Sequence, residues 1–128
     1  MDPSGRHLPS LAPIDAYGNG GFRFGGMSHR GSLLCLPTGI WASDVKSMGE
    51  IDEAVLAPVL HPATPEAAID HFLIGGGRDF PIMPSSLREV FRARRIALEA
   101  MTTGAAVRTY NILLGERRRI GALLVAVD

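Results

Sequence analysis

Hydrophobic and polar residues follow two different patterns along this 128-residue chain, and the pattern changes near residue 43. Before that point, short runs either alternate apolar with polar residues or are continuously apolar, and glycine-rich turns separate them. This arrangement is typical of β-hairpins. The strands predicted here are 14–17, 22–24, 33–36 and 40–42. We therefore expect the N-terminal third of the chain to consist of β-hairpins.

After residue 43, apolar residues recur at helical spacing, and extended runs lie between the helical stretches. Two Ser-x-x-Glu capping boxes, which begin at Ser47 and Ser86, predict helices over 47–57 and 84–95. Further strands are predicted over 69–74, 96–100 and 120–127. Together with strand 40–42 this gives the order β-α-β-α-β-α-β, which favours a mostly parallel sheet with right-handed crossovers.

The third helix is predicted over residues 102–114, because two threonines at its start can accept hydrogen bonds from unpaired N–H groups. Gly115 is expected to end it in the left-handed conformation. Arg108 and Asn111 share one face of this helix. The opposite, apolar face carries Ala106, Tyr110, Leu113 and Leu114. Everything earlier in the chain is expected to pack onto this strand–helix–strand unit.

Length and composition fit a single compact α/β domain. Residues 1–10 hold two prolines and no periodicity, so we expect a flexible N-terminal arm followed by one domain over 11–128. The chain is 46% hydrophobic and 20% charged, and no apolar run reaches the roughly 20 residues of a transmembrane helix. Its start lacks the apolar core of a signal peptide. We expect a cytoplasmic protein without membrane insertion.

The net charge, the cysteine and the histidines exclude some classes of function but indicate none. Thirteen basic and thirteen acidic residues give a formal net charge of zero, which argues against a nucleic-acid-binding protein. Cys35 is the single cysteine and lies between two leucines, so we predict a buried, structural thiol rather than a nucleophile. The scattered histidines lack metal-ligand spacing, and His71 is predicted to be a hydrogen-bonded histidine of a sheet. We expect no catalytic residue, metal or cofactor.

A run of three glycines, Gly75, Gly76 and Gly77, follows the strand predicted over 69–74. A dinucleotide-binding fingerprint beginning at Gly75 would need a glycine where Phe80 stands, and the lysine of a Walker loop is missing. Two interpretations remain. The run is either a plain tight turn or a backbone that a ligand approaches closely.

Ligands of open α/β sheets bind at the carboxyl ends of parallel strands, near helix N-termini. Three predicted strands end in segments that would share one edge, and we refer to these segments as the strand-end rim. The rim residues are Asp44, Gly75, Gly76, Gly77, Arg78, Thr102, Thr103 and Gly104. A carboxylate or phosphate is the ligand that such a rim would favour. We expect Arg108, Tyr110 and Asn111 to support the rim from the adjoining helix.

Three sequence runs resemble a known family. They read Tyr-Gly-Asn-Gly-Gly-Phe-Arg at 17–23, Ile-Gly-Gly-Gly at 74–77 and Arg-Thr-Tyr-Asn-Ile-Leu at 108–113. The chain resembles, from about residue 14 to residue 127, the family of mitochondrial complex I assembly factor 3 and its bacterial and archaeal relatives of unknown function. The resemblance implies a compact β/β/α layered fold. It also implies a role like that of the mitochondrial members, which help to assemble the respiratory NADH:ubiquinone oxidoreductase at the inner membrane.

Two functions are therefore expected as alternatives. The first is a non-catalytic assembly or interaction protein at the cytoplasmic face of the inner membrane. Its protein partners would be respiratory complex I subunits or membrane-protein biogenesis factors. The second is a protein or enzyme that binds a small anionic molecule at the strand-end rim.

Overall fold

The structure is a computed structural model in which residues 6–128 are described. The strands are β1 Arg6–Leu8, β2 Ile14–Gly18, β3 Gly21–Phe24, β4 Met27–Arg30, β5 Ser32–Leu36, β6 Gly39–Ser43, β7 His71–Gly75, β8 Ala97–Met101 and β9 Ile120–Leu124. The α-helices are α1 Ala57–Leu60, α2 Ser85–Ala93 and α3 Thr103–Gly115. Two 3-10 turns span Met48–Glu50 and Pro65–Ala67.

The strands form a six-stranded sheet in the order β1-β6-β5-β9-β7-β8 and a three-stranded sheet in the order β2-β3-β4. β7 pairs in parallel with both β8 and β9, as the crossover reading of the C-terminal half predicted. The large sheet is nevertheless mixed rather than mostly parallel. The hairpin of β5 and β6 enters it, and β5 runs antiparallel to β9. The mixed α/β class is thus confirmed, and the mostly parallel sheet is wrong.

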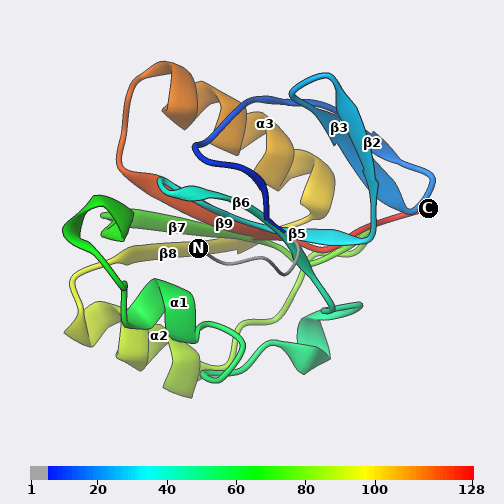
Figure 1. The fold of residues 1–128 in the computed structure, drawn as a ribbon. Helices are drawn as coiled ribbons and strands as arrows, with labels where there is room; N and C mark the ends of the chain where they lie inside the picture. The colour runs from blue at the N-terminus through cyan, green and yellow to red at the C-terminus, as the bar shows by residue number, and fades with distance from the viewer. Residues whose placement is uncertain (1–5) are drawn as a thin grey trace.

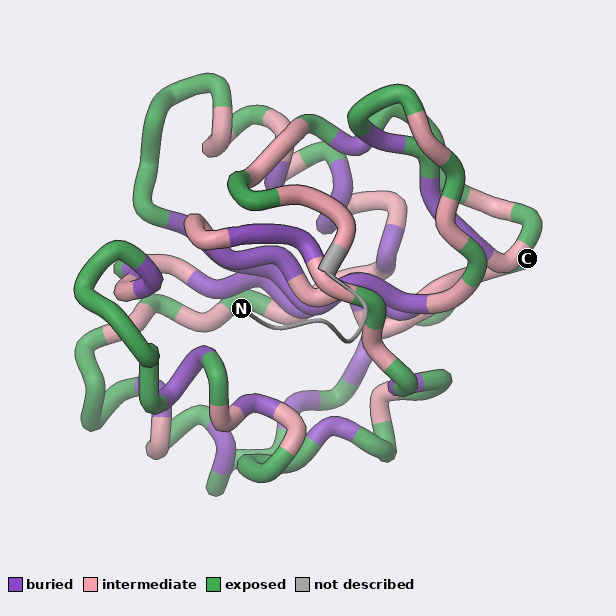
Figure 2. The backbone as a smooth tube through the Cα atoms, viewed as in Figure 1, coloured by how far each residue is buried: buried purple, intermediate pink, exposed green. Residues whose placement is uncertain are grey.

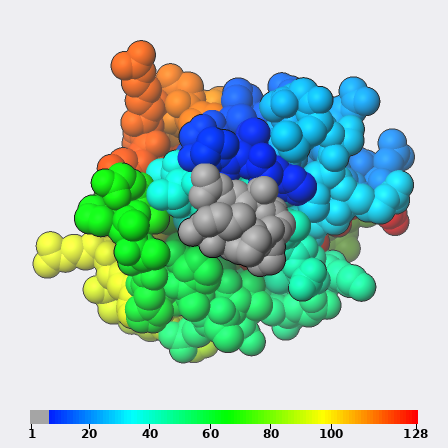
Figure 3. Space-filling view, in the orientation of Figure 1, coloured from blue at the N-terminus to red at the C-terminus, as the bar shows by residue number. Residues whose placement is uncertain are grey.

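The large sheet lies between two layers (Figure 1). Helix α3 and the small sheet cover one face, whereas α1 and α2 cover the other. The β/β/α order implied by the resemblance is therefore present, with α3 as an additional helix beside the small sheet. In the space-filling view the small sheet, in light blue, forms an outer corner of the molecule (Figure 3).

The central strands of the large sheet are buried on both faces, as Figure 2 shows by colour. All five residues of β9 are buried, and β7 is buried from Phe72 to Gly75. β5 is nearly as enclosed, in agreement with its continuous apolar sequence. Because successive side chains of a strand point to opposite faces, Leu73 packs toward α3 while Phe72 and Ile74 pack toward α2.

The helix predicted over 47–57 does not form. A 3-10 turn spans Met48–Glu50, and α1 begins only at Ala57. The Glu50 carboxylate does accept a backbone hydrogen bond, but from the N–H of Lys46, at 3.0 Å. Pro58 lacks an N–H and therefore fits the first turn of a helix, so it starts α1 instead of limiting an earlier helix.

The other two predicted helices form with small differences at their ends. Pro84 stands at the N-cap of α2 without a side-chain hydrogen bond, so the predicted capping box at Ser86 is wrong. Thr102 caps α3 as predicted, and its side chain accepts a hydrogen bond from the N–H of Ala105. Gly115 belongs to α3, and Arg117, with a φ of 58°, adopts the left-handed conformation after it.

The N-terminal arm predicted over 1–10 is only partly described. Residues 1–5 lie outside the described residues. Arg6–Leu8 form β1, which pairs antiparallel with β6, so this part of the chain belongs to the large sheet. The sequence analysis also missed strand β4, Met27–Arg30, because it read the glycines on either side of this segment as one turn.

Cys35 is fully buried between β6 and β9 of the large sheet, as predicted. Burial raises the pKa of its thiol to about 12, so the thiolate is suppressed at neutral pH. We expect Cys35→Ala to lower the free energy of unfolding by about 1 kcal/mol. The native protein should react with a thiol reagent only after denaturation. Fast modification of the folded protein would contradict this structural role.

Candidate functional site

A cleft opens at the carboxyl edge of the large sheet. Because β6, β7, β8 and β9 all run in the same direction, their carboxyl ends lie at this edge. The cleft has a volume of about 790 Å³. Its walls are three strand exits, residues 46–51 after β6, residues 76–84 after β7 and residues 125–128 after β9. We call it the edge cleft.

The structure brings only part of the strand-end rim together at this cleft. Gly76, Gly77 and Arg78 line it, whereas Asp44 and the segment 102–104 do not. Asp44 is displaced because β5 and β9 separate β6 from β7 in the sheet. The segment 102–104 follows β8, on the far side of β7 from β9. From the segment after β6, the exposed Lys46 lines the cleft and Asp44 does not.

The glycine turn uses its backbone groups within the fold. The N–H of Gly76 donates to the carbonyl oxygen of Met101 at 2.9 Å, and the N–H of Gly77 donates to Thr103 Oγ1 at 3.0 Å. The N–H of Thr103 in turn donates to the carbonyl oxygen of Gly77 at 2.8 Å. These donors are committed to internal partners. The geometry therefore favours the plain-turn interpretation over a backbone cradle for an anion.

The rim glycines let neighbouring segments approach closely. A Cβ atom on Gly75 would lie 3.0 Å from Ala106 Cβ, so this glycine allows α3 to pack on the sheet. A Cβ atom on Gly76 would lie 2.7 Å from Pro81 Cβ. On Gly104 it would collide with the hydroxyl group of Tyr17. Tyr17 therefore covers the start of α3. A bulky substitution at Gly76 would disturb the packing of Pro81, so it is unsuitable as a test of ligand binding.

Two buried hydroxyl side chains hold the strand exits together beneath the edge cleft. Thr103 Oγ1 donates to the carbonyl oxygen of Val125 at 2.7 Å while it accepts from Gly77. Ser32 Oγ donates to the carbonyl oxygen of Val45 at 2.6 Å and accepts from the N–H of Ala126. The two hydroxyls thereby join the exits of β7 and β6, respectively, to the exit of β9.

Tyr110 and Asn111 support the N-terminal hairpins rather than a ligand. The Asn111 side chain accepts from the N–H of Ile14 and donates to its carbonyl oxygen, both at 2.9 Å. The Tyr110 hydroxyl donates to the carbonyl oxygen of Ala12 at 2.8 Å, and burial raises the pKa of this hydroxyl. Arg108 is exposed and lines a groove of about 390 Å³ between β2 and α3.

The most exposed apolar side chains of the edge cleft were not predicted from the sequence. Phe80 is 75% exposed and Ile82 is 88% exposed, and both border the cleft. The signal was present as an apolar Phe-Pro-Ile run in a loop that has neither helical nor strand periodicity. Lys46 and Arg78 add positive charge to the cleft, and Asp79 adds a negative one.

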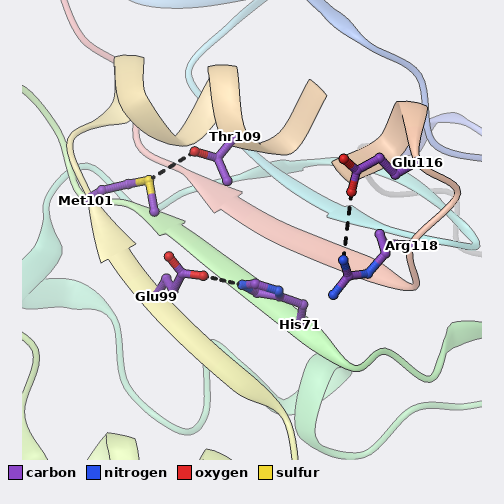
Figure 4. Close-up of polar contacts among 6 residues, drawn as sticks. All are labelled: His71, Glu99, Met101, Thr109, Glu116 and Arg118. Atoms are coloured by element: carbon purple, nitrogen blue, oxygen red, sulfur yellow. Dashed lines mark hydrogen bonds and ion pairs between the residues drawn. The ribbon is translucent and has the colours of Figure 1, made fainter. Parts of the chain in front are cut away.

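Three histidines outside the edge cleft make contacts within the fold. His71 Nε2 lies 2.6 Å from Glu99 Oε2, which confirms the predicted hydrogen-bonded histidine of the sheet (Figure 4). His29 Nε2 contacts the carbonyl oxygen of Ser32, so this nitrogen carries the proton and Nδ1 accepts from His7. Burial lowers the pKa of His29. No group of three or more metal-ligating side chains occurs within residues 6–128.

Together these features define a small mixed α/β domain with an edge cleft at the carboxyl ends of four strands of its large sheet. The model of a family described as a protein of unknown function (DUF498/DUF598) matches residues 14–125. The chain therefore belongs to this family.

Relatives share both sequence and fold. An uncharacterized protein of Rhodobacter capsulatus is 36% identical over 125 residues, which cover 98% of this chain and 93% of that protein. The Rpa2829 protein of Rhodopseudomonas palustris is 50% identical, with a TM-score of 0.82 over 95% of this chain and 88% of the other. A Bartonella henselae structure described as an outer membrane protein is 46% identical, with a TM-score of 0.87 over 95% and 100% of the two chains.

Within residues 6–128, none of the helices has the length and apolar character needed to span a membrane.

Proposed function

We propose that this chain is a non-catalytic interaction protein and that its edge cleft binds a protein partner. The observation that carries the proposal is the exposure of Phe80 and Ile82 beside the cleft. Aromatic side chains are enriched at protein interfaces, and a few large side chains carry most of the binding free energy there. Scattered single apolar residues need no such explanation, but these two lie two positions apart in one loop.

The chemistry of the described residues supports binding rather than turnover. The Cys35 thiol and the Tyr110 hydroxyl are buried, and burial raises the pKa of each. The backbone donors of the glycine turn are engaged in the fold. A catalytic site needs an accessible nucleophile or a proton-transfer group with a matched pKa, and these groups do not supply one.

The finer proposal concerns the partner. The resemblance to complex I assembly factor 3 supports a role in the assembly of a respiratory complex at the cytoplasmic face of the inner membrane. On this proposal the partners are complex I subunits or membrane-protein biogenesis factors. An exposed apolar loop beside a cleft would suit transient contact with an unassembled subunit, whose own apolar surface is still accessible.

The test is a double substitution of Phe80 and Ile82 by serine in the native host. We expect the amount of co-purified partner to fall by at least about tenfold, because interface anchors carry most of the binding free energy. The level of assembled complex I in a deletion strain should not be restored by this variant. Ile112→Ser is the matched control, because Ile112 is 55% exposed on α3 and does not line the cleft.

Full rescue by the Phe80 and Ile82 double variant, with thermal stability unchanged, would exclude these two side chains as the anchors of a protein partner. A deletion strain with normal complex I that accumulated one metabolite would support the alternative function. In that alternative the edge cleft binds a small anionic molecule through Lys46 and Arg78, both of which line it. Arg78→Ala should then abolish rescue, while the serine double variant should retain it.

A further inference from the structure

A second concave surface lies on the outer face of the small sheet, away from the edge cleft. It is a hollow of about 370 Å³. Its floor contains Ala16, Gly18 and Gly21, which have little or no side chain, and Arg23 and Arg30 stand beside it. It includes most of the run 17–23 that contributed to the family resemblance, and the proposed function of the edge cleft does not use it.

Strand alternation places both arginines on the same outer face. Phe22 and Phe24 of β3 are buried against the core, so Arg23 between them points outward and is exposed. β4 pairs with β3 in a register that sets Arg23 opposite Ser28 and Arg30 opposite Gly21. Arg23 and Arg30 are therefore diagonal neighbours across the two strands, at a Cβ separation of roughly 7–8 Å.

The floor is open because the backbone requires glycine. Gly18 and Gly20 have φ values of 127° and 80°, which favour glycine, and they shape the turn between β2 and β3. A Cβ atom on Gly21 would collide with the carbonyl oxygen of His29, since β4 approaches there. Arg30 extends toward this turn, and its Nη1 lies 3.8 Å from the Cβ position of Gly20.

The hollow is positively charged, and the charge is not neutralised by the fold. Among the described residues 6–128, no aspartate or glutamate lines it. Within residues 6–128, neither Arg23 nor Arg30 has a carboxylate oxygen within 4.0 Å, whereas Arg92 and Arg118 each have a glutamate partner. The formal net charge of the chain is zero, so an effect of Arg23 and Arg30 would be local to this surface.

We propose that this hollow binds a carboxylate side chain of an acidic segment in a protein partner. Arg23 and Arg30 both line the hollow, and each guanidinium group can donate paired N–H groups to the oxygens of a carboxylate. Arginine is one of the residues that most often anchor protein interfaces. The proposal does not depend on the edge cleft.

The test uses the full chain labelled with ¹⁵N and three probes. These are a tetraglutamate peptide, the matched tetraglutamine peptide and inorganic phosphate. We expect tetraglutamate to shift the amide signals of residues 16–23 and 28–30 and tetraglutamine to leave them unchanged. The double variant Arg23→Gln/Arg30→Gln should weaken tetraglutamate binding by at least about tenfold, since charge-assisted hydrogen bonds to both arginines are lost. Arg117→Gln/Arg118→Gln, with the same change in charge, should bind within about twofold of the wild type.

Each other outcome overturns the proposal. If both double variants bound tetraglutamate equally weakly, the peptide would be attracted by the net charge of the protein and not by a specific site. Phosphate binding at the same residues with an affinity equal to that of tetraglutamate would mean a general anion site and would exclude selection of an acidic segment. No shift at residues 16–23 would exclude the hollow altogether. Thermal unfolding of each variant verifies the fold, and both arginines are exposed, so we expect no loss of stability.

Discussion

Replacement of Asn111 by alanine should lower the free energy of unfolding by about 2–4 kcal/mol, because it leaves two backbone groups of Ile14 without partners. Ile14 is only 3% exposed and the two hydrogen bonds are part-buried, so water replaces the lost amide only in part. The Asn111 side chain satisfies the N–H and the carbonyl oxygen of Ile14 together, as a neighbouring strand would do. It thereby fastens the small sheet to α3. Urea denaturation measures the loss.

Two comparison variants separate this effect from ordinary surface truncation. Asn111→Asp keeps an acceptor for the N–H of Ile14 but offers no donor to its carbonyl oxygen, so its stability should lie between those of wild type and alanine. Arg108→Ala, on the same helix but exposed, should change the free energy of unfolding by less than about 0.5 kcal/mol. An equal loss in the alanine variants of Asn111 and Arg108 would show that the two hydrogen bonds contribute nothing special.

Amide hydrogen exchange shows which part of the fold is loosened in Asn111→Ala. In Asn111→Ala the amides of residues 14–30 should exchange faster than in wild type, while those of β7 and β9 should keep most of their protection. The reason is that the small sheet meets the rest of the molecule through one apolar cluster and these polar anchors. Uniform acceleration across the chain would instead indicate global destabilisation without local release of the hairpins.

The features that sequence reasoning predicted are those set by local chemistry. Thr102 caps α3 because its hydroxyl can reach an N–H three residues later, and this requires no tertiary information. The apolar run around Cys35 predicted a strand covered on both faces. The parallel pairing of β7 with β8 followed from a single crossover helix between them. The apolar face of α3, which contains Ala106 and Tyr110, is buried as its helical spacing predicted.

The features that it missed depend on partners distant in sequence. Pro58 suits either the end of one helix or the beginning of another, and the packing of Val59 and Leu60 in the core selects the second. The large sheet is mixed because β9 pairs with β5, a contact across 87 to 91 residues that no local pattern encodes. The rim failed as a unit for the same reason, since the insertion of β5 and β9 separated Asp44 from Gly75.

In the candidate site, too, the positions set by local sequence were predicted and those set by the fold were not. Arg78 and the glycines at 76 and 77 were correctly placed at a strand exit, and they do line the edge cleft. The role of these glycines could not be predicted from the sequence. The sequence does not show whether the N–H of Gly76 is free or is bonded to Met101. The exposure of Phe80 and Ile82 was equally hidden, since an apolar residue in a loop is buried or exposed according to what the fold brings above it.

Thr103→Val should also lower the free energy of unfolding by about 2–4 kcal/mol, although valine has nearly the same shape. The side chain is fully buried, and its hydroxyl group both donates to the carbonyl oxygen of Val125 and accepts from the N–H of Gly77. Valine would leave both groups unsatisfied at the base of the edge cleft. Chemical denaturation provides the measurement, and Thr103→Ser, which keeps the hydroxyl, should lose only about 1 kcal/mol.

The comparison of valine with serine also separates the two interpretations of the rim. If the hydroxyl group mainly holds the exits of β7 and β9 together, amide exchange at Gly76 and Gly77 should accelerate in Thr103→Val and remain slow in Thr103→Ser. The edge cleft would then lose its shape, and partner binding through Phe80 and Ile82 should weaken in the valine variant alone. A valine variant within about 0.5 kcal/mol of wild type would contradict the structural role of this hydroxyl. Its hydrogen bonds would then be dispensable, and the geometry of the glycine turn would have to come from the packing of Pro81 on Gly76.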